Sequence, residues 1–256
     1  MKKAIAILLI VISIHQLNSQ IKVDISQIEK RSIDGKSLIY KDNQKYDGVV
    51  YENYTFKKQV YSVKNGMKEG PYEYYFENRQ LKRKTFFKKD KIDGPYEEYY
   101  ENGQLKIKTI FTEGKYNGPL EMYFRNGQLQ AKGTLVLGEY EGILEKFYDN
   151  GQLKKSITFK NGLQNGPYKA YYENGKLRIK MTYVNGMKNG DIEKYFENGN
   201  LFVKAYYIND REEGVFEKYY ENGQLQSKQF FKNGKQSKIS EEYAENGSIK
   251  NKKSFN

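Results

Sequence analysis

The sequence lacks residue types on which many enzymes and small secreted domains depend. Among 256 residues there is no cysteine, no tryptophan and a single histidine, His15. A chain without cysteine has no disulfide framework, no thiolate metal ligand and no cysteine that could carry a lipid anchor. A Ser-His-Asp triad or a histidine metal site would have to use His15. Carboxylate, lysine, tyrosine or arginine chemistry is what remains open to an enzyme.

Residues 1–19 differ in composition from the rest and predict a secretory signal peptide. Lys2 and Lys3 give a basic start, residues 4–14 are apolar, and residues 17–19 offer a cleavage site. The apolar run is too short to span a bilayer as a helix, and an uncleaved interfacial anchor is the alternative. Cleavage would remove His15 and lower the formal net charge from +12 to about +10. We expect an exported protein in the periplasm, at the cell surface or outside the cell, and not a lipoprotein.

One short motif recurs along the chain at a constant spacing. Glu-Asn-Gly-Gln-Leu or a near copy begins every 24 residues, at positions 77, 101, 125, 149, 173, 197, 221 and 245. A constant period of this length is typical of repeat proteins, in which each copy is one supersecondary unit. All four prolines stand at one phase of the repeat, directly after a glycine: Pro71, Pro95, Pro119 and Pro167.

Each repeat reads as two strands and two tight turns. Asn161-Gly162 and Asn174-Gly175 flank a tyrosine-rich stretch, and Asn-Gly between alternating segments is a strong signal for a two-residue hairpin turn. The sequence predicts an all-β, elongated repeat protein, a single-layer twisted antiparallel β-meander of about eight 24-residue hairpin repeats. We expect an N-terminal cap segment at residues 20–38 and the repeat domain at residues 39–256. The predicted structural turns of the second phase contain Asn102, Gly103, Asn126, Gly127, Asn150, Gly151, Asn174, Gly175, Asn222 and Gly223.

Counting outward from two-residue turns assigns the side chains to two faces. In the first copy, Phe76 should pair with Leu81 on one side of the sheet and Tyr75 with Lys82 on the other. The first side carries aromatic and aliphatic rows and is the better candidate for a buried or inward-curving face. The second side carries a tyrosine row beside cross-strand Glu–Lys pairs. The candidate binding face consists of Tyr75, Tyr99, Tyr123, Phe147, Tyr171, Tyr195, Tyr219, Lys82, Lys106 and Lys154.

The repeat unit has a recognisable pattern. It is carried by Phe159, Asn161-Gly162, Gly166-Pro167-Tyr168, Tyr172-Glu173-Asn174-Gly175 and their copies. This pattern resembles the MORN repeat, and more closely the bacterial variant in proteins named YwqK-family antitoxins. The resemblance covers about residues 39–256, although the chain has no tryptophan and has Pro-Tyr after the second glycine. It implies a β-meander that acts as a binding scaffold.

These observations favour a noncatalytic, exported scaffold that binds another protein or a polymer. Ring ladders on both faces of a single-layer sheet cannot both be buried within the chain, so a protein partner or a homodimer through the apolar face is expected to cover one. Electrostatic binding to an anionic membrane lipid or polysaccharide surface is the first alternative, because of the excess positive charge. Antitoxin-like neutralisation of a protein partner is the second.

Nucleic-acid binding and catalysis fit the sequence poorly. Glutamates interleave with the basic and aromatic residues, which disfavours a nucleic-acid partner. Recurrent carboxylates such as Glu101, Glu173 and Glu221 follow the turn phase, so no unique acid or nucleophile departs from the repeat. We expect no catalytic residue, no metal site and no cofactor.

Overall fold

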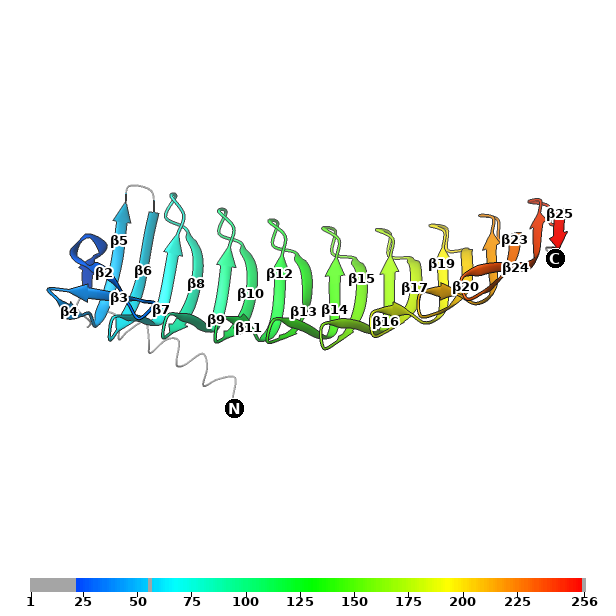
Figure 1. Ribbon diagram of the computed structural model, residues 1–256. Coiled ribbons are helices and arrows are strands. Elements are labelled where there is room, and N and C mark those ends of the chain that lie inside the picture. Colours follow the sequence, from blue (N-terminus) through cyan, green and yellow to red (C-terminus); the bar gives the residue numbers. More distant parts are fainter. Residues whose placement is uncertain (1–21, 55–56, 255–256) are drawn as a thin grey trace, which may run out of the picture. The chain divides into compact units, whose positions relative to one another are not determined.

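The described part of the chain consists of strands joined by tight turns. The computed structural model describes residues 22–54 and 57–254, and the chain divides into two compact units, Met1–Gly127 and Gln128–Asn256. Figure 1 shows each unit as a succession of strands. The elements of the first unit are β1 (Lys22–Asp24), the 3-10 helix η1 (Ile25–Gln27), β2 (Glu29–Ile33), β3 (Lys36–Lys41), β4 (Gln44–Lys45), β5 (Gly48–Tyr54), β6 (Lys57–Lys64), β7 (Met67–Tyr75), β8 (Leu81–Lys88), β9 (Lys91–Tyr99), β10 (Leu105–Thr112), β11 (Lys115–Tyr116) and β12 (Gly118–Tyr123).

The second unit continues with the same alternation of strands. Its elements are β13 (Leu129–Val136), β14 (Glu139–Phe147), β15 (Leu153–Lys160), β16 (Leu163–Tyr171), β17 (Leu177–Val184), β18 (Met187–Lys188), β19 (Gly190–Tyr195), β20 (Leu201–Ile208), β21 (Arg211–Glu212), β22 (Gly214–Tyr219), β23 (Leu225–Lys232), β24 (Lys235–Tyr243) and β25 (Ile249–Ser254). Within the described residues, no helix is long and apolar enough to cross a membrane. The predicted signal peptide lies outside the described residues.

In each unit the repeat strands pair antiparallel with their neighbours in the chain. β7 pairs with β6 and β8, and β16 pairs with β15 and β17 in the second unit. The register recurs with the 24-residue period, because Glu73 pairs with Lys84 and Glu97 pairs with Lys108. The predicted all-β class and the hairpin repeat are therefore confirmed.

The turns at the Asn161-Gly162 phase are two-residue turns, as predicted. Lys160 pairs directly with Leu163, and Asn161 and Gly162 have φ angles of 50° and 75°. Two successive residues with positive φ make a type I′ turn, whose twist matches that of the strands it joins. Asparagine followed by glycine adopts this conformation at the least cost, which is why the pair recurs.

The turns at the Asn102-Gly103 phase are one residue longer than predicted. The N–H of Tyr100 donates to the carbonyl of Gln104 at 2.8 Å, and the N–H of Gly103 donates to the carbonyl of Tyr100 at 2.9 Å. Gly103 has a φ of 84°. A type I turn followed by a left-handed residue is the usual three-residue hairpin loop. The loop consists of Glu101, Asn102 and Gly103.

The longer loop changes the strand register beside it. Tyr75 pairs with Leu81, so the predicted pairs Phe76–Leu81 and Tyr75–Lys82 are wrong. Lys82 is instead the extra residue of a bulge, and the pairs farther from the turn are as predicted. The longer loop and the bulge each shift the register by one residue in opposite directions, and their effects cancel.

One turn of this phase has arginine where its copies have glycine. Arg79 has a φ of 68°, and its N–H donates to the carbonyl of Phe76 at 3.0 Å, the bond that Gly103 makes one copy later. We expect Arg79→Gly to raise the free energy of unfolding by about 1 kcal/mol, because a Cβ atom is disfavoured in the left-handed region. Urea denaturation measures the change, and Gly103→Arg is the reciprocal control that should be destabilised. An Arg79→Gly protein no more stable than the wild type would contradict the expectation.

The Gly-Pro steps form bulges on one side of their strand. Between β8 and β9, residues 93–95 stand opposite a single residue of β8. Between β9 and β10 the pairing is continuous through Gly94 with Phe111 and Pro95 with Ile110. Proline has no N–H to donate, so it is tolerated where the ladder on one side is interrupted. Such a bulge bends the strand.

The row of residues through Tyr72 is buried in both units, as predicted for the apolar side. The exposed fractions are 6% at Tyr96 and 5% at Leu120 in the first unit, and 3% at Leu144 and 4% at Ile192 in the second. We call the side of each sheet that carries this row the buried face. It supplies most of the apolar burial of the repeats.

An N-terminal cap packs against the first hairpin. β1 pairs in parallel with β5 and so occupies the edge of that strand. β2, β3 and β4 form a separate antiparallel sheet, which extends to residue 45, beyond residue 38 where we predicted the cap to end. One core cluster joins the cap to the hairpins: Val23, Ile39, Tyr46, Val50, Tyr61, Val63 and Tyr72.

Candidate binding surface

The side of each sheet opposite the buried face carries alternating glutamate and lysine. Glu73 of β7 stands opposite Lys84 of β8, which stands opposite Glu97 of β9. In the second unit Lys204 of β20 likewise stands opposite Glu217 of β22. Cross-strand partners point to the same side of a sheet, so these residues form a row within each unit. We call this side the Glu–Lys face.

Several of these charges form ion pairs. The Nζ–Oε distances are 3.9 Å for Lys108–Glu97, 2.9 Å for Lys132–Glu145, 2.8 Å for Lys180–Glu193, 3.9 Å for Lys228–Glu217 and 2.9 Å for Lys252–Glu241. Lys180 faces Lys169 in the ladder and pairs with Glu193 on its other side. Each exposed pair contributes about 0–1 kcal/mol, so their main effect is to neutralise the face and to favour the correct register.

A row of tyrosines lies beside the glutamates and is hydrogen-bonded to them. The hydroxyl donates to the carboxylate two residues earlier: Tyr75 to Glu73 at 2.5 Å, Tyr99 to Glu97 at 2.7 Å, Tyr123 to Glu121 at 2.8 Å, Tyr219 to Glu217 at 2.8 Å and Tyr243 to Glu241 at 2.7 Å. Tyr195 makes the same bond to Glu193. The rings are half-buried and fixed in orientation, which lowers the entropy cost of contacting a partner.

The tyrosines of this row should ionise at a higher pH than an exposed tyrosine. Burial, and next the hydrogen bond to Glu217, raise the pKa of Tyr219 to about 12. The folded pKa lies above the unfolded value near 10, so the stabilisation is complete below about pH 10 and is lost as the pH rises through about 12. A titration of tyrosinate absorbance should show this class of late tyrosines. In Glu217→Gln, one tyrosine should ionise at lower pH, and an unchanged curve would show that the carboxylate has no such effect.

The structure divides the predicted binding face between the two sides of the sheet. Tyr75 pairs with Leu81, so the leucine row accompanies the tyrosines on the Glu–Lys face rather than the buried face. The predicted members of this row are Tyr75, Tyr99, Tyr123, Phe147, Tyr171, Tyr195 and Tyr219. The bulge turns Lys82 away from this row, and its Nζ lies 5.3 Å from the ring centroid of Tyr74.

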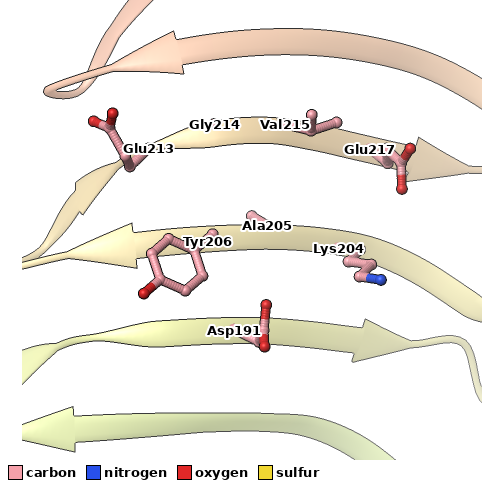
Figure 2. A pocket seen from close by; sticks show the side chains of 8 residues that line it. All are labelled: Asp191, Lys204, Ala205, Tyr206, Glu213, Gly214, Val215 and Glu217. Atoms are coloured by element: carbon pink, nitrogen blue, oxygen red, sulfur yellow. The ribbon is translucent and has the colours of Figure 1, made fainter.

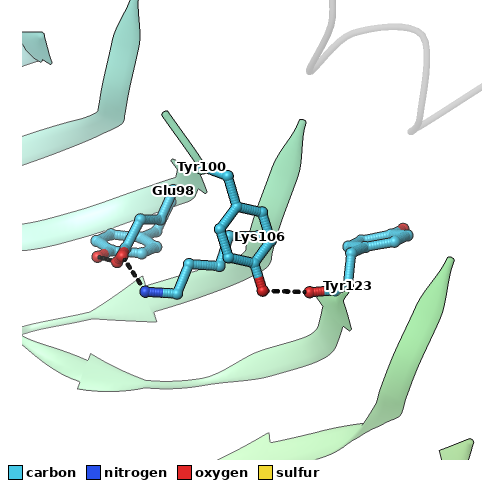
Figure 3. A network of polar contacts seen from close by, with 5 residues as sticks. Glu98, Tyr100, Lys106 and Tyr123 are labelled. Atoms are coloured by element: carbon cyan, nitrogen blue, oxygen red, sulfur yellow. Dashed lines mark hydrogen bonds and ion pairs between the residues drawn. The ribbon is translucent and has the colours of Figure 1, made fainter. Parts of the chain in front are cut away.

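The two other predicted lysines behave like Lys82. Figure 3 shows Lys106 reaching Glu98, with its Nζ 2.8 Å from Oε1. Glu98 stands opposite Arg83, in the row that flanks the buried face. Lys154 Nζ lies 5.0 Å from the ring centroid of Tyr148. The prediction that Lys82, Lys106 and Lys154 share a face with the tyrosine row is therefore wrong.

The predicted turn asparagines are hydrogen-bonded to the equivalent turn of the next repeat. Asn102 Nδ2 donates to the carbonyl of Arg125 in the next turn at 2.9 Å, while its Oδ1 accepts from the N–H of Gln104 at 3.2 Å. The same two bonds recur at Asn150 and Asn222. Beside the same turns, the Tyr100 hydroxyl donates to the carbonyl of Tyr123 at 2.8 Å (Figure 3). The partner glycines all have φ between 83° and 89°: Gly103, Gly127, Gly151, Gly175 and Gly223.

Exposed apolar residues that the sequence analysis did not single out lie on the Glu–Lys face. Ile110 is 41% exposed, Ile143 58% and Val215 38%. Each stands two residues along its strand from a residue of the Glu–Lys row, and Ile110 pairs with Pro95. Alternate residues of a strand share a face, so counting by two from the glutamates is the signal that would have found them.

A shallow depression of about 500 Å³ lies on this face over β19, β20 and β22 of the second unit. Figure 2 shows the side chains of Asp191, Lys204, Tyr206, Glu213, Val215 and Glu217 around it. Both signs of charge are present, so the depression favours neither anions nor cations. In residues 22–54 and 57–254, no three histidine, cysteine, aspartate or glutamate residues form a group that could hold a metal ion.

Comparison with known families gives one result. The family model of the MORN repeat variant matches six segments: residues 92–112, 116–136, 140–161, 164–185, 188–209 and 212–233. Together these segments cover about half of the chain. No curated protein matches the sequence. Successive segments begin 24 residues apart in every case, in agreement with the period of the hairpins.

Proposed function

Because the chain belongs to the MORN repeat variant family, whose repeats are generally protein- or membrane-binding modules, we propose that it is a scaffold that binds a protein partner through the Glu–Lys face. The observation that carries this proposal is that each unit exposes apolar residues on the same face as the fixed tyrosines: Ile110 in the first unit, and Ile143 and Val215 in the second. We include export in the proposal because of the composition of residues 1–19.

The composition of this face resembles that of protein interfaces. Exposed apolar residues such as Ile143 share this face with the tyrosine row, and tyrosine is enriched where partners bind. The hydroxyl–carboxylate bonds hold the rings, so little rotamer freedom is lost on contact. The face repeats the same elements along each unit, which suits a partner that presents an extended or repetitive surface.

The charge pattern favours a protein over a polyanion on this face. Lys108, Lys180 and Lys228 have glutamate partners within 2.8–3.9 Å, so their positive charge is balanced locally. Alternating positive and negative charges favour a partner whose charges alternate in the complementary order, and they disfavour a surface that carries charge of one sign only. Antitoxin-like neutralisation, which specifies the partner as a toxin, stays a prediction, as does a homodimer through an apolar sheet face.

Cross-linking of the full chain in cells that express it tests the proposal. Ile110→Glu combined with Ile143→Glu places one charge at an exposed apolar position of the Glu–Lys face in each unit, and we expect it to abolish capture of the cross-linked partner. The matched control is Ile33→Glu, because Ile33 is 42% exposed and lies in the small sheet of the cap. The control should keep the partner.

Two results would refute the proposal. The partner could be captured equally by the Ile110→Glu/Ile143→Glu protein, which would place its site elsewhere. Alternatively, Ile33→Glu could abolish capture to the same extent, which would show a general loss of folding or solubility. Circular dichroism of both variants separates the second result from a specific effect.

A further inference from the structure

A basic groove lies between the N-terminal cap and the first repeats. Its volume is about 720 Å³. Lys30 and Lys36 line it from the cap sheet and Lys68 lines it from β7. Lys89 lines it from the turn between β8 and β9, and Lys91 from the start of β9. These segments are brought together because the cap docks on the turn before β7. The groove thus gathers five lysines from three separate parts of the chain.

Lys68 has the least exposed ammonium-bearing side chain of the five. It is half-buried, whereas the other four are exposed. Its Nζ lies 5.1 Å from the ring centroid of Tyr61, 5.5 Å from that of Tyr72 and 5.1 Å from that of Phe87. Three rings around one cation hold it in place through cation–π attraction. The pKa of Lys68 is lowered by burial and by the Lys30 ammonium, while Asp90 opposes this shift.

The positive charge of the groove is balanced by a single lining carboxylate, Asp90. Its Oδ1 accepts the backbone N–H of Lys68 at 2.8 Å, and its own N–H donates to the carbonyl of Lys68 at 3.0 Å. Asp90 therefore serves the turn between strands. On the Glu–Lys face, by contrast, lysines alternate with glutamates. Like charges brought together without matching counter-charges cost free energy, which a bound anion would recover.

We propose that this groove binds a ligand that carries phosphate groups. Among the described residues that line the groove, the cations are all lysines, which bind phosphate as point charges, and there is no arginine fork that would select a planar carboxylate. A phosphate group carries a charge of about −1.5 to −2 at neutral pH, which matches several lysines better than a single carboxylate does. Ile39 and Met67 supply apolar contacts for the rest of the ligand.

The second unit contains an internal comparison. The N–H of Lys188 donates to Asp210 Oδ1 at 2.9 Å, and the N–H of Asp210 donates to the carbonyl of Lys188 at 3.0 Å. These are the bonds that join Lys68 and Asp90, repeated 120 residues later. Within the described residues of this unit there is no counterpart of the small cap sheet. The strand and turn motif is thus structural, and the cap lysines are what make the groove.

Isothermal titration of the full chain with pyrophosphate in about 0.15 M salt, where the Debye length is about 8 Å, tests the proposal. We expect Lys30→Gln/Lys36→Gln and, separately, Lys89→Gln/Lys91→Gln to weaken binding by about tenfold or more, because each removes two charge-assisted contacts. Lys115→Gln/Lys160→Gln is the matched control, since both lysines are exposed and the net charge falls equally. The control should change affinity by less than about twofold.

A second arm distinguishes the source of the phosphate. Flotation with phosphatidylcholine vesicles containing phosphatidic acid tests a lipid headgroup. Binding to pyrophosphate that depends on the groove lysines supports a soluble phosphorylated ligand, and binding to the vesicles alone with the same dependence supports a headgroup. Equal weakening by the groove pairs and the control pair would overturn the proposal, because it would show diffuse attraction. Absence of binding to either probe would overturn it as well.

Discussion

Gly66→Ala is expected to lower the free energy of unfolding by about 2–4 kcal/mol, since left-handed strain and a steric clash add together. Gly66 has a φ of 75°, and a Cβ atom there would lie 2.9 Å from the carbonyl oxygen of Ile39 and 3.3 Å from its nitrogen. Both are backbone atoms, so no flexible side chain can move aside. The N–H of Ile39 donates to the carbonyl of Gly66 at 2.8 Å, and the N–H of Gly66 donates to the carbonyl of Tyr46 at 3.0 Å. A shift that relieved the clash would weaken these bonds between the cap and the turn.

Gly114→Ala is the matched control for this prediction. Gly114 occupies the same position in its turn, with a φ of 83° and no atom within 4 Å of an added Cβ. It should lose about 1 kcal/mol, from backbone strain alone. Urea denaturation of the full chain gives both values. A loss for Gly66→Ala no greater than that for Gly114→Ala would show that the cap does not dock on the turn as described.

Much of the fold follows from local patterns that repeat. The Asn161-Gly162 phase has the composition of a type I′ turn, and two residues with positive φ are found there. Alternation over the strand then places Tyr72 and Tyr96 on one side, which the structure buries. The period extends the inference to Lys89-Asp90, which has neither asparagine nor glycine but has two positive φ angles like the other copies.

The register beside the second turn could not be read from the same signal. Asn-Gly fits the last two positions of a three-residue loop as well as it fits a type I′ turn, because both need glycine in the left-handed region. What differs is the conformation of the asparagine: Asn161 has a positive φ, whereas in the second phase it is the glycine that takes this conformation. The bulge at Lys82 compensates for the longer loop. The strand pairs beyond the bulge are therefore the same as for a two-residue turn, and the alternation of apolar residues there does not reveal the change of register next to the turn.

The basic groove lay beyond sequence reasoning for a different reason. Lys30 and Lys36 come from a segment without the repeat, and Lys68 stands where the next two copies have Ile92 and Tyr116. Nothing periodic connects these positions. Their proximity depends on how the cap sheet docks, which is a long-range packing event.

Asn102→Ala is expected to lower the free energy of unfolding by about 2 kcal/mol, because it removes two hydrogen bonds that contribute about 0.5–1.5 kcal/mol each. One bond is within the turn, from the N–H of Gln104 to Asn102 Oδ1. The other joins two turns, from Asn102 Nδ2 to the carbonyl of Arg125. Asn102→Asp keeps the acceptor and loses the donor, so it should lose about half as much. Glu101→Ala is the control, because Glu101 offers its carbonyl rather than its side chain to Asn78.

The two bonds of Asn102 also differ in where their loss should be felt. Hydrogen exchange of Asn102→Ala should show faster exchange in the next turn, where the carbonyl of Arg125 accepts one lost bond, as well as at Gln104, whose N–H donates the other. A single three-residue loop has few contacts of its own, so its stability comes from the turn stacked against it. If only the mutated turn exchanged faster, the asparagine would be a local cap. If the neighbouring turn loosened with it, the Glu-Asn-Gly-Gln motif recurs because it couples one hairpin to the next.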